Sequence, residues 1–196
     1  MGPLGLSVNK QEQASQGYTL FTPMQGQTTY LIDMRGNVVQ RWELPYRPGD
    51  YGYLLENGNL LMSGRTHKGP VEIGGRGGII MELDWDGNKV WEYVEDTLHH
   101  DFSRMDNGNT MVLGWEQVPP DVEKTVQGGI AGPTEKGLWC DYFREVTSSG
   151  ATVWEWHGFE QLDPVADAIC HLHHRDEWTH TRSEEHTSEL QSHLNL

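Results

Sequence analysis

Basic side chains are scarce in this sequence. Against 29 Asp and Glu stand only 14 Lys and Arg, which gives a formal net charge of −15. A nucleic-acid-binding protein presents a basic face to the phosphates, so this balance argues against a nucleic-acid partner. It does not exclude a small anionic substrate, because the local field at a site can oppose the overall charge.

Cysteines and long apolar stretches are also few. Cys140 and Cys170 are the two cysteines, outside any CxxC pattern, which excludes a disulfide framework and allows one bridge at most. No segment reaches the roughly 18 apolar residues of a membrane helix, so we expect no membrane partner. Residues 1–24 lack the basic start and apolar run of a signal peptide, which predicts a cytoplasmic protein. The periplasm is the alternative if the N-terminus is incomplete.

Glycine, in contrast, is abundant at 23 residues, and much of it lies in repeated patterns. The segment IDMRGNVV at 32–39 returns as LDWDGNKV at 83–90 and as VTSSGATV at 146–153. Between these copies, LENGNLL at 55–61 returns as MDNGNTM at 105–111. Both patterns place glycine where a tight hairpin needs a positive φ angle, so each copy predicts a β-hairpin.

The repeat length indicates the fold. Two hairpins make four antiparallel strands, and a displacement of about 50 residues is the length of one β-propeller blade. We therefore predict an all-β fold: a partial β-propeller of about two and a half four-stranded antiparallel blades, spanning residues 16–181. A β-sandwich or barrel with turns that are alike by coincidence is the alternative. We expect large aromatic side chains to fill the gaps between blades, namely Trp42, Trp91, Trp154 and Trp156.

The two ends of the chain fit neither hairpin pattern. Residues 1–15 are interpreted as an N-terminal arm. Residues 182–196 read RSEEHTSELQSHLNL, and the first 11 of them match one translation frame of a common short-read sequencing adapter. We interpret this tail as non-native and disordered, encoded by a metagenomic gene that was cut short. The natural protein is then expected to continue with further blades.

Histidines form two groups that could carry chemistry. His99 and His100 lead into the second NGN hairpin, and the innermost strand of a propeller blade lines the central channel, so we predict that they face a pocket. A merely hydrogen-bonded pair in a turn is the alternative. The second group, at 171–180, matches no zinc spacing. We interpret it mainly as a solvated loop and predict no metal and no cofactor; a metal-binding protein using 171–180 is a third possibility.

One short segment of the sequence is rich in glycine. Gly74–Gly78 is flanked by Arg65, His67 and Arg76, and backbone amides in such a run can bind an anion. The spacing matches no phosphate loop, so a flexible connection between blades is the favoured interpretation.

Several of these segments, taken in order, resemble the bacterial arylsulfotransferase family between about residues 16 and 181. The segments are GYTLF at 17–21, YLIDMRGNVV at 30–39, GIIMELDWDGN at 78–88, HHDF at 99–102, NGN at 107–109, WEW at 154–156 and EWTH at 177–180. The resemblance implies a six-bladed propeller with its active site in the central channel. It also implies transfer of a sulfuryl group from a phenolic sulfate ester to a phenol through a histidine intermediate, without a nucleotide donor.

The resemblance assigns roles to three histidines. It implies a sulfuryl-binding histidine at His100, with His99 as the alternative, and a second one at His180. In the family this second histidine belongs to a His-x-Asn motif, whereas Arg182 stands at the matching position here.

The family's nucleophilic histidine and key arginine have no counterpart in this chain, and His186 and His193, in the adapter-like tail, do not replace the histidine. We therefore expect the chain itself to be inactive. Its partners would be a small aryl sulfate and a phenol. The alternative function is a non-catalytic propeller that binds a ligand or partner through its channel face.

Overall fold

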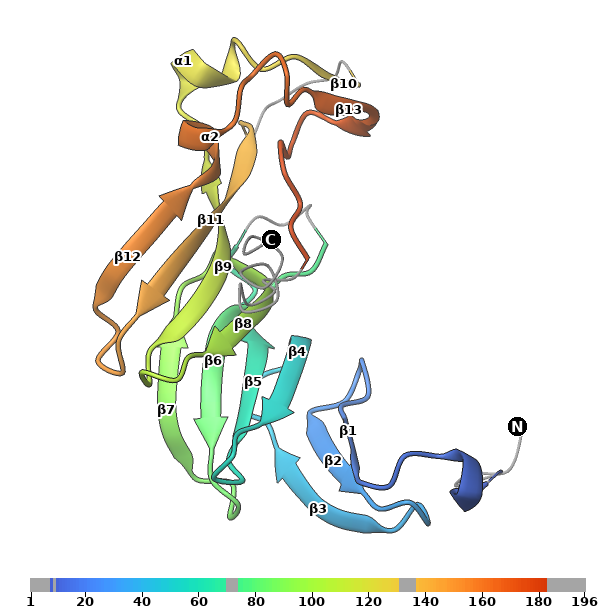
Figure 1. The fold of residues 1–196 in the computed structure, drawn as a ribbon. Helices are drawn as coiled ribbons and strands as arrows, with labels where there is room; N and C mark the ends of the chain where they lie inside the picture. The colour runs from blue at the N-terminus through green and yellow to red at the C-terminus, as the bar shows by residue number, and fades with distance from the viewer. Residues whose placement is uncertain (1–7, 9, 70–73, 131–136, 183–196) are drawn as a thin grey trace, which may run out of the picture.

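The computed structural model describes residues 8, 10–69, 74–130 and 137–182, and the regular secondary structure of this part of the chain is almost entirely β-strand (Figure 1). Helical structure is limited to three short segments, η1 (Gln11–Gln13), α1 (Pro120–Glu123) and α2 (Gly158–Gln161). The strands are β1 (Thr19–Phe21), β2 (Thr28–Ile32), β3 (Val38–Glu43), β4 (Pro48–Leu54), β5 (Leu60–Arg65), β6 (Gly78–Leu83), β7 (Lys89–Val94), β8 (Leu98–Arg104), β9 (Thr110–Gln117), β10 (Gly128–Ile130), β11 (Trp139–Val146), β12 (Thr152–His157) and β13 (Ile169–His174).

The strands form three antiparallel sheets and one small parallel pair. The first sheet has the order β1-β2-β3, the second β4-β5-β6-β7 and the third β8-β9-β11-β12. Strands β10 and β13 pair in parallel beside the third sheet. No helix in the described ranges has the length and apolar character needed to cross a membrane.

All five predicted hairpins are present, and their turns share one geometry. In each turn the first residue's N–H donates to the carbonyl of the fifth residue, as from Asp33 to Asn37 at 3.0 Å and from Leu55 to Asn59 at 2.8 Å. The fourth residue is a glycine with φ between 80° and 86°, the left-handed conformation that closes a three-residue hairpin loop. The ten strands flanking these turns were predicted; β1, β10 and β13 carry no turn pattern and were missed.

The hydrophobic core lies between the sheets. Leu60 and Met62 of β5 pack toward the first sheet, against Leu31 and Trp42. Leu61, which points to the opposite face of the same strand, packs toward Phe102 in the third sheet. The two central strands of the second sheet, β5 and β6, are therefore buried on both faces, which explains why apolar residues follow one another in both strands without strict alternation.

Of the four tryptophans predicted to fill the gaps between blades, Trp42 and Trp91 reach the next sheet, Trp156 is half-buried beside Phe143 of its own sheet, and Trp154 is exposed. Trp42 is buried and donates its indole N–H to the Asp84 carbonyl of the next sheet at 2.8 Å. Trp91 is partly buried and donates in the same way to Ser148. Trp154 is 47% exposed, so its assignment to the core was wrong. It lies on β12, the edge strand of the third sheet, and no sheet covers that strand within the part of the chain described.

Candidate functional site

Two strands, β4 and β8, bulge at equivalent places. Over residues 48–52, β4 advances four positions while its partner β5 advances two. Over residues 98–102, β8 likewise advances four positions while its partner β9 advances two. Such extra residues leave the ladder and redirect their side chains. The middle residues of the two bulges are Asp50 and His100, and their side chains face each other, with 3.9 Å between Oδ2 and Nε2.

His99 is held inside the third sheet. Its ring stacks on Trp115 with 3.8 Å between the centroids and 11° between the planes. Its Nε2 lies 3.2 Å from Oδ1 of the buried Asp141, the cross-strand neighbour of Trp115. The contact has the distance of a hydrogen bond, although its angle falls outside the range of one. His99 thus belongs to the sheet interior, not to an open surface.

The position of His100 depends on the glycine-rich run. His100 has a φ of 46°, and its N–H donates to the carbonyl of Gly75 at 2.9 Å. A Cβ atom on Gly75 would lie 1.9 Å from Cε1 of the His100 ring, and Gly75 itself has a φ of 81°. The run interpreted as a flexible connection therefore leaves room for His100, a role that the sequence pattern did not indicate.

His180 reaches the same place from a distant part of the chain. The segment before it runs parallel to the start of β11, where Trp178 N–H donates to the carbonyl of Trp139 at 2.7 Å. Just after it, Thr181 N–H donates to Oδ2 of Asp141 at 2.7 Å. These two contacts bring His180 next to His100.

The three histidines form a chain that ends in a carboxylate on each side. Nδ1 of His99 lies 2.9 Å from Nδ1 of His100, and Nε2 of His100 lies 3.3 Å from Nε2 of His180. Nδ1 of His180 hydrogen-bonds to Glu177, and His99 faces Asp141 at the other end. The order is Asp141, His99, His100, His180, Glu177.

Burial keeps the inner histidines neutral. It lowers the pKa of His100 from 6.5 to about 4, helped by the neighbouring His99 and His180. Burial also lowers the pKa of His99 and outweighs the opposing effect of Asp141. For Asp141, burial acts to raise the pKa, but the contacts with His99 and with the Thr181 N–H prevail and hold its pKa below the usual value.

The tautomers of the three histidines decide which ring nitrogens can donate a proton. If His99 directs Nε2–H at Asp141, its Nδ1 accepts a proton from His100 Nδ1–H, which leaves a lone pair on His100 Nε2. If His180 directs Nδ1–H at Glu177, its Nε2 also carries a lone pair. The two Nε2 lone pairs then face each other, and one proton added between them would give the pair a positive charge. The pair can therefore hold a proton or donate it to an anionic oxygen.

The remaining candidates lie elsewhere. His171, His173 and His174 are exposed on β13, apart from His180. No group of three or more metal-ligating side chains that could hold a metal ion occurs among the described residues. The partners Asp50, Trp115, Asp141 and Glu177 were missed. The two bulges bring Asp50 to His100, the pairing of β8, β9 and β11 brings Trp115 and Asp141 to His99, and Glu177 lies three residues before His180.

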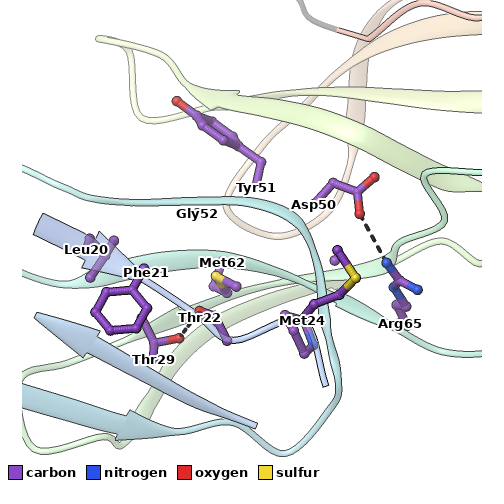
Figure 2. A pocket seen from close by; sticks show the side chains of 12 residues that line it. Leu20, Phe21, Thr22, Met24, Thr29, Asp50, Tyr51, Gly52, Met62 and Arg65 are labelled. Carbon is purple, nitrogen blue, oxygen red and sulfur yellow. Dashed lines mark hydrogen bonds and ion pairs between the residues drawn. The ribbon is translucent and has the colours of Figure 1, made fainter. Parts of the chain in front are cut away.

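A cavity of about 340 Å³ adjoins this site, between β1 and β2 on one side and β4 and β5 on the other (Figure 2). Its polar end is formed by Asp50 and Arg65, which pair at 3.1 Å. The remaining wall is mixed: Thr22 and Thr29 contribute polar groups, and the apolar part comes from Leu20, Phe21, Met24 and Met62. Arg65, noted earlier beside the glycine-rich run, thus belongs to this cavity.

Comparison with known protein families gives a match to one family. The model of the arylsulfotransferase (ASST) family matches residues 7–192. This range includes most of residues 182–196, the tail that we interpret as non-native. Residues 183–196 lie outside the part of the chain that the structure describes. The non-native origin of the tail stays a prediction.

Among solved structures, the chain is similar to a crystallised protein of unknown function from Bacteroides caccae. The two are 16% identical with a TM-score of 0.46, and the match covers 74% of this chain and 47% of that chain. This chain thus spans about half the length of that protein. No curated protein matches.

Proposed function

We propose that this chain, which belongs to the arylsulfotransferase (ASST) family, is part of an enzyme that moves a sulfuryl group from a phenolic sulfate ester to a phenol. The observation that supports this most is the contact of His100 with His180, 80 residues apart, at 3.3 Å between their Nε2 atoms. The resemblance had assigned sulfuryl binding to both histidines, and the fold brings them together.

The histidine pair suits the chemistry. Charge accumulates on the sulfuryl oxygens in the transition state, and fixed N–H donors in a partly buried site stabilise such charge. The proton shared by His100 and His180 would supply one such donor. In this proposal the group that attacks sulfur is another histidine, which forms the covalent intermediate and belongs to a part of the natural protein not present in this chain.

We further propose that the three sheets are successive blades of a six-bladed propeller. The 50-residue repeat and the two four-stranded antiparallel sheets support this arrangement. The contact between the bulges of β4 and β8 also supports it, because these two strands would line one central channel.

Activity measurements on two proteins test the function. We expect the full-length natural protein, recovered from the source DNA, to release 4-nitrophenol from 4-nitrophenyl sulfate when a phenol acceptor is present, and the 196-residue chain to release none. In the full-length protein, His100→Ala should lower kcat about 100-fold or more, as loss of an oxyanion donor does. His173→Ala, on exposed β13, is the matched control and should retain activity. An active 196-residue chain, or a fully active His100→Ala variant, would contradict the proposal.

A further inference from the structure

His100 and His180 have the spacing of two metal ligands. Their Nε2 atoms are 3.3 Å apart, whereas a typical hydrogen bond from an N–H group is about 2.9–3.0 Å long. In a tetrahedral zinc site with Zn–N bonds of about 2.0–2.1 Å, two ligating nitrogens lie about 3.3–3.4 Å apart. The observed separation therefore matches two ligands of one metal ion better than a direct hydrogen bond.

The orientation of the two rings suits the same role. Their centroids are 4.8 Å apart and their planes meet at 69°. This centroid separation is too short for two rings placed end to end with 3.3 Å between their nitrogens, so the rings meet at an angle. Both lone pairs can then converge on one ion beside the pair.

Each histidine has its other ring nitrogen engaged, as metal-ligating histidines usually do. Nδ1 of His180 hydrogen-bonds to the carboxylate of Glu177, and Nδ1 of His100 lies 2.9 Å from Nδ1 of His99. With the proton on Nδ1 in both rings, each Nε2 carries a lone pair for a metal. The partners behind the two rings therefore favour the tautomers that metal binding requires.

Asp50 can supply a third ligand. Its Oδ1 pairs with Arg65 at 3.1 Å, as Figure 2 shows, and its Oδ2 lies 3.9 Å from Nε2 of His100. The described residues contain no group of three ligands placed to hold a metal ion as they stand, so Asp50 has to move closer. Its side chain is 34% exposed and has room to move, and those of His100 and His180 are 14% and 25% exposed, so an ion can enter.

We propose that Nε2 of His100 and Nε2 of His180 bind one divalent transition-metal ion of the zinc type, with Asp50 as the third ligand and water as the fourth. Imidazole nitrogen is a good ligand for Zn²⁺, Cu²⁺ and Ni²⁺, whereas Mg²⁺ and Ca²⁺ prefer oxygen. This site shares only His180 with the histidine group at 171–180 considered from the sequence. Zinc binding needs no sulfuryl transfer, so an inactive full-length protein would not count against it.

Zinc titration of the 196-residue chain tests the proposal. Competing ligands on exposed β13 and in the tail are first replaced by Ser or Gln, namely Cys170, His171, His173, His174, His186 and His193. In this background we expect one Zn²⁺ per chain in equilibrium dialysis, and a large excess of Mg²⁺ should not displace it. A chain that retains no zinc after dialysis would overturn the proposal.

Variants locate the bound ion. His100→Ala and His180→Ala should each weaken zinc binding at least about 100-fold, and Glu177→Ala about 10- to 100-fold, as loss of the partner behind a histidine ligand does. Asp50→Asn should weaken binding to a smaller extent. Arg182→Asn removes a positive charge that acts on His100 and should strengthen binding.

A matched control is available on β12. His157 also pairs its Nδ1 with a carboxylate, that of Glu116 at 2.8 Å, and His157→Ala should leave zinc binding unchanged. Asp86→Asn, in the exposed β6–β7 turn, is the corresponding control for Asp50→Asn. Zinc binding that survives both His100→Ala and His180→Ala would overturn the site.

A second measurement needs no variant at the site, which removes any doubt about misfolding. Co²⁺ bound in a tetrahedral site absorbs visible light far more strongly than octahedral Co²⁺, so we expect intense bands at one equivalent. With Zn²⁺, the ¹⁵N NMR signals of Nε2 in His100 and His180 should shift more than those of Nδ1. A weak, octahedral Co²⁺ spectrum, or shifts confined to other histidines, would overturn the assignment of the ligands.

Discussion

Asp50 and His100 occupy the same position in two successive repeats, 50 residues apart, and their side chains meet at 3.9 Å. Each is the middle residue of a bulge that displaces β4 or β8 by two positions against its neighbour. The same kind of β-bulge thus places a carboxylate at the site in one repeat and an imidazole in the next. The repeat supplies the geometry, and the residue at the bulge decides the chemistry.

Replacing Gly75 should displace His100. Gly75→Ala would place a Cβ atom 1.9 Å from the His100 ring at a residue with φ of 81°. We expect a loss of roughly 2–4 kcal/mol in the free energy of unfolding, of which about 1 kcal/mol comes from the left-handed backbone and the rest from crowding of the His100 ring. Urea denaturation measures the loss, and the NMR shifts of the His100 ring report its displacement.

Gly108→Ala separates the two effects. Gly108 has nearly the same φ, 83°, but nothing lies within 4 Å of its added Cβ atom. Gly108→Ala should therefore lower the free energy of unfolding only by the cost of the left-handed backbone, about 1 kcal/mol, and leave the NMR shifts of the His100 ring unchanged. Equal losses for the two variants would show that Gly75 does not make room for His100.

Stability should fall when the pH decreases from about 6.5 to about 4. Burial lowers the pKa of His100 to about 4, while an unfolded chain protonates this histidine near 6.5. Between these values the unfolded chain binds a proton that the folded chain excludes, so acidification favours unfolding. His99 acts in the same direction. The groups that act on His100 are His99, His180, Arg182 and Asp50, of which only Asp50 opposes the lowered pKa.

Urea denaturation at several pH values measures this dependence. His100→Gln should make the free energy of unfolding less sensitive to pH in this window, whereas His173→Gln, on exposed β13, should not. An unchanged slope in His100→Gln would contradict the buried, neutral state of His100.

Two tryptophans should respond very differently to truncation. Trp42 is 1% exposed and fills the interface between the first and second sheets, so Trp42→Ala should cost about 3–5 kcal/mol. Trp154→Ala, at a side chain that is 47% exposed, should cost less than about 1 kcal/mol. Chemical denaturation compares the two variants. Similar losses would mean that β12 is covered in solution, for example by a second copy of the chain.

The two cysteines should differ in reactivity. Cys140 is buried, and burial raises the pKa of its thiol to about 11, whereas Cys170 is exposed. A thiol reagent should therefore label one cysteine in the native chain and both in denaturant, because only the thiolate reacts. Cys170→Ser should abolish the native labelling. Rapid labelling of the Cys170→Ser variant would contradict the packing of β11.

The hairpins could be predicted because their information is local. A glycine in the fourth position of each five-residue turn adopts a φ that other residues avoid, and the flanking residues are strand formers. The resemblance to a family also named His99, His100 and His180 as candidates, although their roles stay a prediction. Strands β10 and β13 could not be predicted, because neither adjoins a turn pattern and each pairs with a distant partner.

The sequence by itself determined the order of the hairpins, the all-β class and the acidic balance, since these depend on neighbouring residues or on composition alone. Only the tertiary structure decided which side chains meet. Asp141 reaches His99 because β8, β9 and β11 pair side by side. His180 reaches His100 because residues 176–181 dock along β11, and Asp50 reaches His100 because two bulges face each other. Such contacts join residues up to about 80 positions apart, and no local pattern encodes them.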